Sequence, residues 1–318
     1  MTVAIKKPAE DIPDDEWNAL SLSDQAFLEF IYEVFDYFDE VVRQKLGWKP
    51  EQIQINQGKN NIVLAFNHDQ KRYLFRVPKY GRQQLQRYMR AAQLLEDQPF
   101  FSERIYIDGN CMIETYAPGV TLNQDAPSGA YIALAKALNL MHQQKGQGFG
   151  GLRVGTTGHD DSVFDHYLPM MTERIEDLKQ LFPNQAVSLD AVFELWQQKL
   201  NSISSPLCLC HGDLWSDNVL YDKDTDHLTI IDWDSCGIYH REKDLHFLLS
   251  DDVPSANKDL FFQHYDTEPD WQLMSWYRVT MNVLYFKADR GSHLQTAVNH
   301  FFEQMKTEER LVIDSDTI

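Results

Sequence analysis

The sequence is poor in basic residues for its length. Among 318 residues, 29 are Lys or Arg and 48 are Asp or Glu, which gives a formal net charge of -19. Nucleic acids and anionic membrane surfaces both bind through cationic side chains, so this composition argues against either as a partner. A cationic small molecule would be attracted instead. A surface whose acidity serves only solubility explains the same charge, and composition alone does not separate these interpretations.

Cysteine is also scarce, which excludes a disulfide framework and favours a reducing, cytoplasmic location. The chain has four: Cys111, Cys208, Cys210 and Cys236. Cys208 and Cys210 precede His211, but a single intervening residue is tighter than the usual spacing of zinc ligands, and no second cluster is visible. We interpret the pair as cysteines on one face of a buried strand.

Long hydrophobic runs are absent. No segment approaches the roughly 20 apolar residues of a membrane-spanning helix, and residues 1–8 lack the apolar core of a signal peptide. The hydrophobic share of 43% is that of a globular protein, and the length suits two lobes.

Periodicity along the chain predicts where these lobes begin and end. Residues 23–46 have a broad apolar helical face that Gly47 ends. Residues 62–66 and 73–77 read as a strand hairpin. Helical patterns dominate after Pro118 and Gly119. The predicted parts are an N-terminal helical segment, 1–50, a small β-rich lobe, 51–117, and a large helical lobe, 118–318.

The most informative stretch is residues 207–237, LCLCHGDLWSDNVLYDKDTDHLTIIDWDSCG. It places Asp213 and Asn218 on a loop before a predicted hairpin, and Asp232 and Asp234 directly after it. Oxygen ligands suit Mg²⁺, which takes one or two protein oxygens and the phosphates of a substrate. Asn218 and Asp232 can supply those two oxygens, and Asp213 can accept a proton from an attacking hydroxyl. Phosphoryl transfer needs these parts.

The pattern H-G-D-x-x-x-x-N followed by I-D-W-D resembles the signature of the aminoglycoside phosphotransferase family, which shares the two-lobed protein-kinase-like fold. The resemblance implies an α+β fold with a small antiparallel β lobe and a larger, mainly helical lobe. It implies that Asp213 is the catalytic base, that Asn218 and Asp232 bind Mg²⁺, and that ATP or GTP is the phosphate donor. His211 is then a supporting residue that hydrogen-bonds backbone near Asp232. For Asp234, support of the metal site, contact with substrate and a solvated turn remain open.

The resemblance extends to the nucleotide-binding half of the family. Gly58 and Asn60 lie in a loop similar to the family's nucleotide-covering loop, with a plain turn as the equal alternative. Arg76 matches the basic residue of the third strand that contacts the nucleotide phosphates. Glu114 and Tyr116 lie in a segment that resembles the hinge, whose backbone holds adenine. Later in the chain, Asp244 of the R-E-K-D-L segment is expected to be structural, as a helix cap.

One residue of the family's nucleotide-binding half is missing from this sequence. Related kinases pair the third-strand cation with a glutamate from the small-lobe helix, and alignment puts Arg90 at that position. No glutamate lies between residues 51 and 96, which leaves Gln86, Gln93 or Glu96 as partners for Arg76. The absence supports a non-catalytic nucleotide-binding regulator as an alternative. The intact trio of Asp213, Asn218 and Asp232 argues against it.

The acceptor is expected to be a hydroxylated, cationic small molecule. An aminoglycoside is the first hypothesis and would make the protein an antibiotic-resistance enzyme. Trp215 is either the floor of a sugar pocket or core, and Asp251 and Asp252 either line a cationic site or face solvent. The segment H-G-D-L-W-S also resembles the fructosamine kinase motif, from which D-W-D departs, so a fructosamine or amino-alcohol kinase is the alternative. Neither the acceptor, the choice of ATP or GTP, nor the oligomeric state follows from the sequence.

Overall fold

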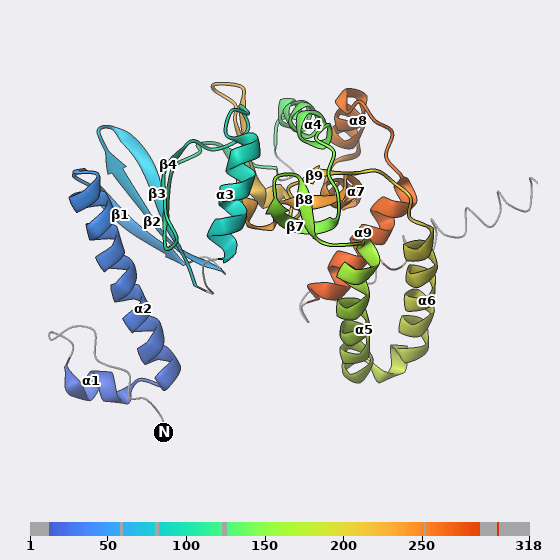
Figure 1. Ribbon diagram of the computed structural model, residues 1–318, viewed down its shortest axis with the longest axis horizontal. Helices are drawn as coiled ribbons and strands as arrows, with labels where there is room; N and C mark the ends of the chain where they lie inside the picture. The colour runs from blue at the N-terminus through green and yellow to red at the C-terminus, as the bar shows by residue number, and fades with distance from the viewer. Residues whose placement is uncertain are drawn as a thin grey trace, which may run out of the picture. The chain divides into compact units, whose positions relative to one another are not determined.

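The computed structural model describes residues 13–57, 60–79, 83–122, 126–250, 252–286 and 298. Contacts divide the chain into two compact units (Figure 1). Unit 1 comprises Met1–Gln86 and Ser102–Tyr116, and unit 2 comprises Arg87–Phe101 and Ala117–Ile318. The predicted N-terminal segment, 1–50, thus shares a unit with most of the predicted small lobe, whereas residues 87–101 belong to unit 2.

Unit 1 pairs an N-terminal helical region with one antiparallel sheet (Figure 1). The helices are α1 (Asp14–Ala19) and α2 (Leu22–Phe38), the latter continued by a π-helical turn, Asp39–Lys45. The strands are β1 (Glu51–Gln57), β2 (Asn61–His68), β3 (Lys71–Pro78), β4 (Arg104–Ile107) and β5 (Met112–Thr115), in the order β1-β2-β3-β5-β4. The Ser21 side chain accepts from the amide of Asp24 and so caps α2.

The core of unit 1 lies between α2 and one face of this sheet. Phe38 is fully buried, and its ring meets those of Phe66 and Phe75 edge-on, with centroids 5.1 and 5.3 Å away. Phe66 and Phe75 stand on adjacent strands, β2 and β3, which pair in register. The apolar face predicted for residues 23–46 therefore packs on the predicted hairpin.

Helix α3 (Gln83–Leu95) leads into the segment that belongs to unit 2. Phe101, at the end of that segment, forms a bridge with Ile230, and its ring centroid lies 5.1 Å from that of the fully buried Trp233. These contacts explain why residues 87–101 pack with the larger unit although they lie between two strands of unit 1 in the sequence.

Unit 2 is mainly helical and contains two small sheets (Figure 1). Its further helices are α4 (Ser128–His142), α5 (Val163–Leu181), α6 (Ala186–Ser202), α7 (Glu242–Leu245), α8 (Ser255–His264) and α9 (Trp271–Leu284). Its strands are β6 (Val120–Thr121), β7 (Phe149–Val154), β8 (Thr157–Asp160), β9 (Leu207–Cys210), β10 (Val219–Asp222), β11 (His227–Ile230) and β12 (Gly237–His240). The sheets have the orders β11-β10-β6 and β8-β7-β12-β9, and the predicted hairpin is β10–β11.

Helices α5, α6 and α9 share an apolar cluster of unit 2. Trp196 and Trp276 stack with ring centroids 5.0 Å apart, and the Trp196 indole donates to Thr280 Oγ1 at 2.7 Å. Buried indole N–H groups need such partners. This core therefore requires a particular arrangement of side chains in addition to apolar contact. An antiparallel β-rich unit and a larger helical unit together give the predicted α+β class.

None of the helices in the described ranges is both long and apolar enough to cross a bilayer.

Candidate functional site

The two motifs of the sequence adjoin neighbouring strands of one sheet. Strand β9 delivers the loop that begins at His211, and the turn Trp233–Ser235 delivers the chain into β12. Strands β9 and β12 pair antiparallel, with Cys210 opposite Gly237. The His211–Asp213 loop and the Asp232–Ser235 turn therefore meet at the same end of this sheet.

Gly212 is the point of closest approach between these loops. Its φ is +82°, and a Cβ there would lie 2.2 Å from the carbonyl oxygen of Ser235. No side chain fits at that distance, and a positive φ also strains any residue except glycine. Glycine at this position thus lets the two loops touch.

Gly212→Ala is expected to lower the free energy of unfolding by about 2 kcal/mol more than Gly155→Ala does. Gly155 also has a positive φ, +50°, but a Cβ added there would have nothing within 4 Å. The control therefore carries the backbone strain without the steric clash. Urea unfolding of both variants measures the difference, and equal losses would show that the loops separate at no cost.

His211 connects the two loops by its imidazole. The ring is buried, its Nε2 lies 2.8 Å from the carbonyl oxygen of Ile231, and its Nδ1 accepts from the Asp213 amide at 3.3 Å. Because Nδ1 accepts, Nε2 is the nitrogen that donates. Ile231 immediately precedes Asp232, so this is the backbone hydrogen bond expected from the sequence.

Asp213 is oriented by the residues that follow it. The Trp215 indole donates to Asp213 Oδ1 at 2.9 Å, and the Asn218 side-chain nitrogen donates to the Asp213 carbonyl at 2.8 Å. Trp215 is 37% exposed and meets the ring of His246 edge-on at 4.9 Å. One carboxylate oxygen of Asp213 is therefore fixed by an indole that itself packs against a buried side chain.

Asn218 and Asp232 are joined through the backbone. The amide of Ile231 donates to the Asn218 carbonyl at 2.9 Å, and Asp232 follows in a left-handed conformation, with φ 65° and ψ 55°. This conformation is uncommon outside glycine and marks a constrained turn. Because the Asn218 nitrogen donates to the Asp213 carbonyl, the side-chain oxygen of Asn218 is the atom that could bind a metal, and a carboxamide oxygen with the Asp232 carboxylate is a donor set that fits Mg²⁺. Asp234 is half-buried within the same short turn.

Asp244 accepts hydrogen bonds from backbone amides of the His211–Asp213 loop, which corrects the expectation that it caps a helix. Its carboxylate is fully buried and accepts from the amides of His211 at 2.7 Å and Gly212 at 2.9 Å. His142 Nε2 lies 3.1 Å from the same carboxylate. Burial opposes the charge, but the hydrogen bonds from His142 and the Gly212 amide hold the pKa of Asp244 below its ordinary value. His142 was missed in the sequence because no local motif marks it.

In unit 1, Arg76 has a carboxylate partner that the sequence did not indicate. Its guanidinium lies 2.9 Å from Glu114 Oε1, and Ser102 Oγ donates to the other carboxylate oxygen at 2.8 Å. Strand register explains this pair. Arg76 lies opposite Met112 on β5, so Glu114, two residues further, projects from the same face. Arg90, at the position of the missing glutamate, donates to the Leu152 carbonyl instead.

The hinge amides are engaged within unit 1. The amide of Thr115 donates to the Glu103 carbonyl at 2.9 Å, and that of Tyr116 donates to the Arg72 carbonyl at 3.0 Å. The Arg72 guanidinium also lies over the Tyr116 ring, 4.7 Å from its centroid. An adenine that used these two amides would have to break those bonds.

The nucleotide-covering loop is described only in part. The Asn60 carbonyl accepts from the Lys79 amide at 2.9 Å, and Gly58 lies outside the described residues.

The acidic residues proposed for an acceptor site have local partners where they are described. Asp252 is exposed and bonds Ser250 Oγ at 3.1 Å. Asp270, a further acidic residue of the C-terminal third, caps α9 through the Leu273 amide and lies 3.6 Å from Lys199 Nζ. Asp251 is outside the described residues. These contacts account for the described carboxylates as helix caps and turns, so a cationic acceptor site remains a prediction.

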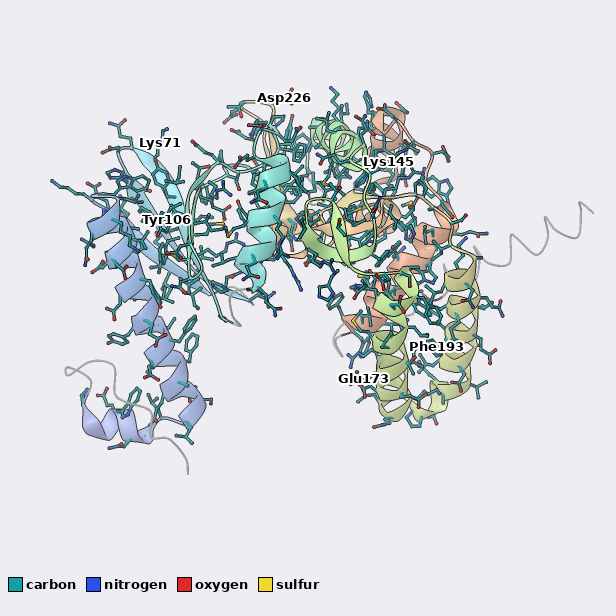
Figure 2. The ribbon with its side chains drawn as sticks, in the orientation of Figure 1. Lys71, Tyr106, Lys145, Glu173, Phe193 and Asp226 are labelled. Carbon is teal, nitrogen blue, oxygen red and sulfur yellow. The ribbon has the colours of Figure 1, made fainter. Side chains whose placement is uncertain are left out.

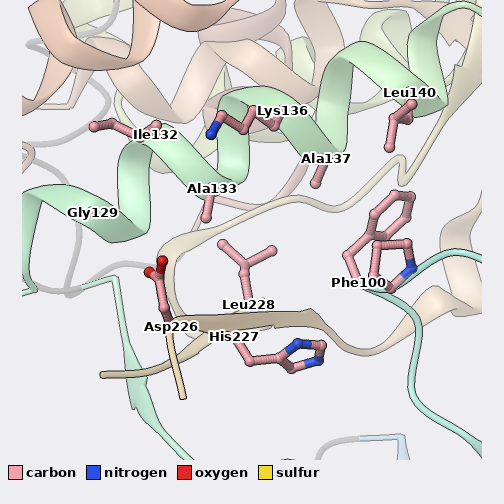
Figure 3. Close-up of a pocket in the computed structure, with 11 residues that line it drawn as sticks. Phe100, Gly129, Ile132, Ala133, Lys136, Ala137, Leu140, Asp226, His227 and Leu228 are labelled. Atoms are coloured by element: carbon pink, nitrogen blue, oxygen red, sulfur yellow. The ribbon is translucent and has the colours of Figure 1, made fainter. Parts of the chain in front are cut away.

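A cavity of about 340 Å³ lies elsewhere in unit 2, between α4 and the β10–β11 hairpin (Figure 3). Its walls include Ile132, Lys136 and Leu228, and Asp226 stands at its rim, on the turn of the hairpin (Figure 2). Of the described loop residues, neither Asp213 nor Asp232 lines it. The residues of the sequence motifs therefore lie outside the lining of this cavity.

A small antiparallel β unit, a larger helical unit and the paired loops around Asp213 and Asp232 define a protein-kinase-like fold. The model of the phosphotransferase enzyme family matches residues 51–279, and the chain belongs to that family. The predicted family and fold class are thereby confirmed.

Three similar proteins share between 13% and 22% of their residues with this chain. Ethanolamine kinase 2 of Rattus norvegicus is 22% identical over 207 residues, which are 62% of this chain and 53% of that protein. The match thus spans about half the length of that relative. Choline kinase LicA from Streptococcus pneumoniae is 17% identical, with a TM-score of 0.61 over 85% of this chain and 99% of that one. Aminoglycoside phosphotransferase APH(4)-Ia, in a thermostable mutant form, is 13% identical, with a TM-score of 0.63 over 85% and 99%.

Proposed function

We propose that the protein is a Mg²⁺-dependent kinase that transfers the γ-phosphate of ATP or GTP to a hydroxyl of a small, cationic acceptor. The observation that carries the proposal is the oriented carboxylate of Asp213, held by the Trp215 indole at 2.9 Å within a loop tied to Asn218 and Asp232. A base, two oxygen ligands and family membership together specify phosphoryl transfer.

The residues of the loop divide the chemistry between them. Asp213 accepts the proton of the acceptor hydroxyl as its oxygen bonds to the γ-phosphorus and the bond to the nucleoside diphosphate breaks. Asn218 and Asp232 would hold Mg²⁺, which when bound neutralises the phosphate oxygens. Arg76, kept in place by Glu114, is the phosphate-binding cation of unit 1. His211 and Asp244 keep the loop in shape.

The acceptor class is proposed from charge and from relatives. The net charge of -19 favours a cation. The relatives are named for ethanolamine, choline and aminoglycosides, all hydroxylated amines. A hydroxylated amine is therefore the proposed acceptor: an aminoglycoside, an amino alcohol or a fructosamine. All four cysteines are free and buried, which supports placing the protein in the reducing cytoplasm.

A nucleotide-binding regulator without catalysis is the second candidate. Its main support was the glutamate missing from the small-lobe helix. Glu114 supplies Arg76 with a carboxylate from another element, so that support is weakened.

Transfer of labelled γ-phosphate to a panel of hydroxylated amines tests the proposal. The panel includes aminoglycosides, aminocyclitols, choline, ethanolamine and glycated amines, each with ATP and GTP and with Mg²⁺ or EDTA. We expect Mg²⁺-dependent product from at least one amine. Thermal shifts with nucleotide measure binding alone, and binding without turnover across the panel would favour the regulator.

Trp215→Phe is expected to lower kcat about tenfold with little change in nucleotide KM. The variant keeps the aromatic ring and loses only the N–H that orients Asp213, a hydrogen bond to a charged group. Trp271→Phe is the matched control, because that indole is similarly exposed, at 40%, and bonds Glu268 instead. Comparable kcat values for both variants would show that the indole bond does not position the base.

Glu114→Gln is expected to raise nucleotide KM and to destabilise the protein by about 2 kcal/mol, because a buried guanidinium loses its carboxylate charge. Glutamine keeps the size and an acceptor oxygen, so unfolding remains measurable. The exposed Glu103 provides the control Glu103→Gln in the same unit. A variant with unchanged nucleotide KM would leave Arg76 as a structural residue only.

A further inference from the structure

Two sulfur atoms and an imidazole lie together next to the His211–Asp213 loop, which is the proposed catalytic loop. Cys208 and Cys210 are alternate residues of β9, so their side chains leave the strand on one side. Their Sγ atoms are 3.7 Å apart. His142, the last residue of α4, completes the group, in which the candidate ligand atoms lie within 4.8 Å of one another. We name these three residues the thiol–imidazole cluster.

The sequence did not favour a metal site here because one residue separates Cys208 and Cys210 and no second cluster of ligands is visible. The fold supplies the third ligand from another element, the C-terminal end of α4. The Leu209 amide donates to the Gln144 carbonyl at 2.8 Å, and Cys208 forms a bridge with Lys145. The chain just after His142 is thus joined to β9 by backbone, which makes the cluster a fixed feature of unit 2.

The separation of the sulfurs favours a metal ion over a disulfide. Two thiolates on a tetrahedral Zn²⁺, each at about 2.3 Å, are about 3.8 Å apart. The observed distance is 3.7 Å, so the sulfurs need hardly move. A disulfide requires about 2.05 Å, so they would have to approach by roughly 1.7 Å within one strand.

We propose that Cys208, Cys210 and His142 bind one thiophilic divalent cation of the Zn²⁺ class. Thiolate and imidazole ligands suit Zn²⁺ and Cd²⁺ and do not suit Mg²⁺. The site is therefore chemically distinct from the oxygen ligands of Asn218 and Asp232. Cys208 is only 5% exposed and Cys210 fully buried, so the cation enters through local opening, and binding is slow.

Occupancy of the cluster would act on the catalytic loop. Both ring nitrogens of His142 are engaged, Nδ1 with Tyr265 at 2.7 Å and Nε2 with Asp244 at 3.1 Å. A cation bound through Nε2 exchanges the bond to Asp244 for a metal bond. Asp244 in turn holds the amides of His211 and Gly212. Binding should therefore slow phosphoryl transfer, a consequence that rests on the proposed function, whereas binding itself does not.

Titration of the reduced, folded protein with Cd²⁺ tests the site directly, because cadmium thiolates absorb in the ultraviolet. We expect one Cd²⁺ per chain, displaced by Zn²⁺ and not by Mg²⁺. Cys208→Ala and Cys210→Ala should each weaken binding at least about tenfold, since loss of a ligand costs no less than loss of a supporting residue. Cys236→Ala, at a buried cysteine of the same unit outside the cluster, should bind as the natural protein does.

Three results would overturn the site: no absorption in the natural protein, equal affinity in Cys208→Ala, or absorption that appears only when circular dichroism shows unfolding. The phosphate-transfer panel is scored separately. A protein that binds Cd²⁺ and transfers no phosphate keeps the site and rejects the proposed function. A protein that transfers phosphate and binds no Cd²⁺ keeps the proposed function and rejects the site.

Discussion

Asp213→Asn is expected to reduce kcat by about 10²–10⁴ on the acceptor that the panel identifies, because a positioned general base contributes about that factor. The substitution keeps the size of the side chain and an oxygen that can accept from the Trp215 indole. It also leaves in place the hydrogen bond that the Asn218 side chain donates to the backbone carbonyl of this residue. The loop geometry should therefore survive while the group that takes the proton is lost.

The proposed role of Asp213 also predicts what does not change. Nucleotide binding in the presence of Mg²⁺ should stay near that of the natural protein, measured as a thermal shift, because the ligands Asn218 and Asp232 are intact. Asp217→Asn serves as the control, since Asp217 is an exposed carboxylate of the same loop. If Asp213→Asn kept most of kcat, the base would be another group and the loop would only align the substrates.

The sequence predicted the local parts of this site better than its long-range partners. The spacing from His211 to Asn218 and the following I-D-W-D lie within a single stretch, so the loop, the hairpin and the His211 bond to Ile231 could be expected. Asp244 was assigned a helix cap because helix capping is the commonest local use of an aspartate. Its real partners are amides 32 and 33 residues away, which only the fold brings to it.

The partner of Arg76 was missed for a related reason. The family pattern places the carboxylate partner on the small-lobe helix, where this chain has Arg90 instead. Glu114 lies 38 residues from Arg76 in the sequence, and only the register of β3 against β5 puts the two on one face. Sequence showed that each strand existed, but the face shared by two side chains depends on how the strands are paired.

The second large effect concerns Lys243, the lysine of the R-E-K-D-L segment, to which the sequence assigned no role. Lys243 is 5% exposed, and its Nζ lies 3.6 Å from Met281 Sδ and 4.8 Å from the centroid of the Tyr239 ring. Burial lowers its pKa from 10.5 to about 8, against the attraction of the Asp244 and Asp213 carboxylates. A buried ammonium among aromatic rings costs stability that an uncharged side chain would not.

The sign of the pH dependence follows from this shift. Between pH 8 and 10.5 the unfolded lysine holds a proton that the folded one has lost, so the free energy of unfolding rises with pH across that window. This gain in the free energy of unfolding is complete above pH 10.5 and is lost as the pH falls towards 8. For a shift of this size it amounts to about 3 kcal/mol.

Lys243→Met should therefore be more stable than the natural protein at pH 7, by up to about 3 kcal/mol, less the cation–π attraction to Tyr239 and Tyr167. The difference between the two proteins should shrink as the pH rises from 8 to 10.5. The tyrosines titrate in both proteins, so their contribution to the pH dependence cancels in this difference. Lys136→Met, at an exposed lysine of α4, should show no such trend.

Guanidinium unfolding at several pH values measures these differences. A Lys243→Met protein that is less stable at pH 7, with a difference that does not vary with pH, would mean that the ammonium is compensated in the fold. If the variant is instead stabilised but slower in phosphate transfer, the cost of the buried charge has a functional reason. Lys243 lies next to Asp244, and its charge is felt by Asp213, so a protein that gave up this lysine for stability would change the electrostatic field in which its proposed base works.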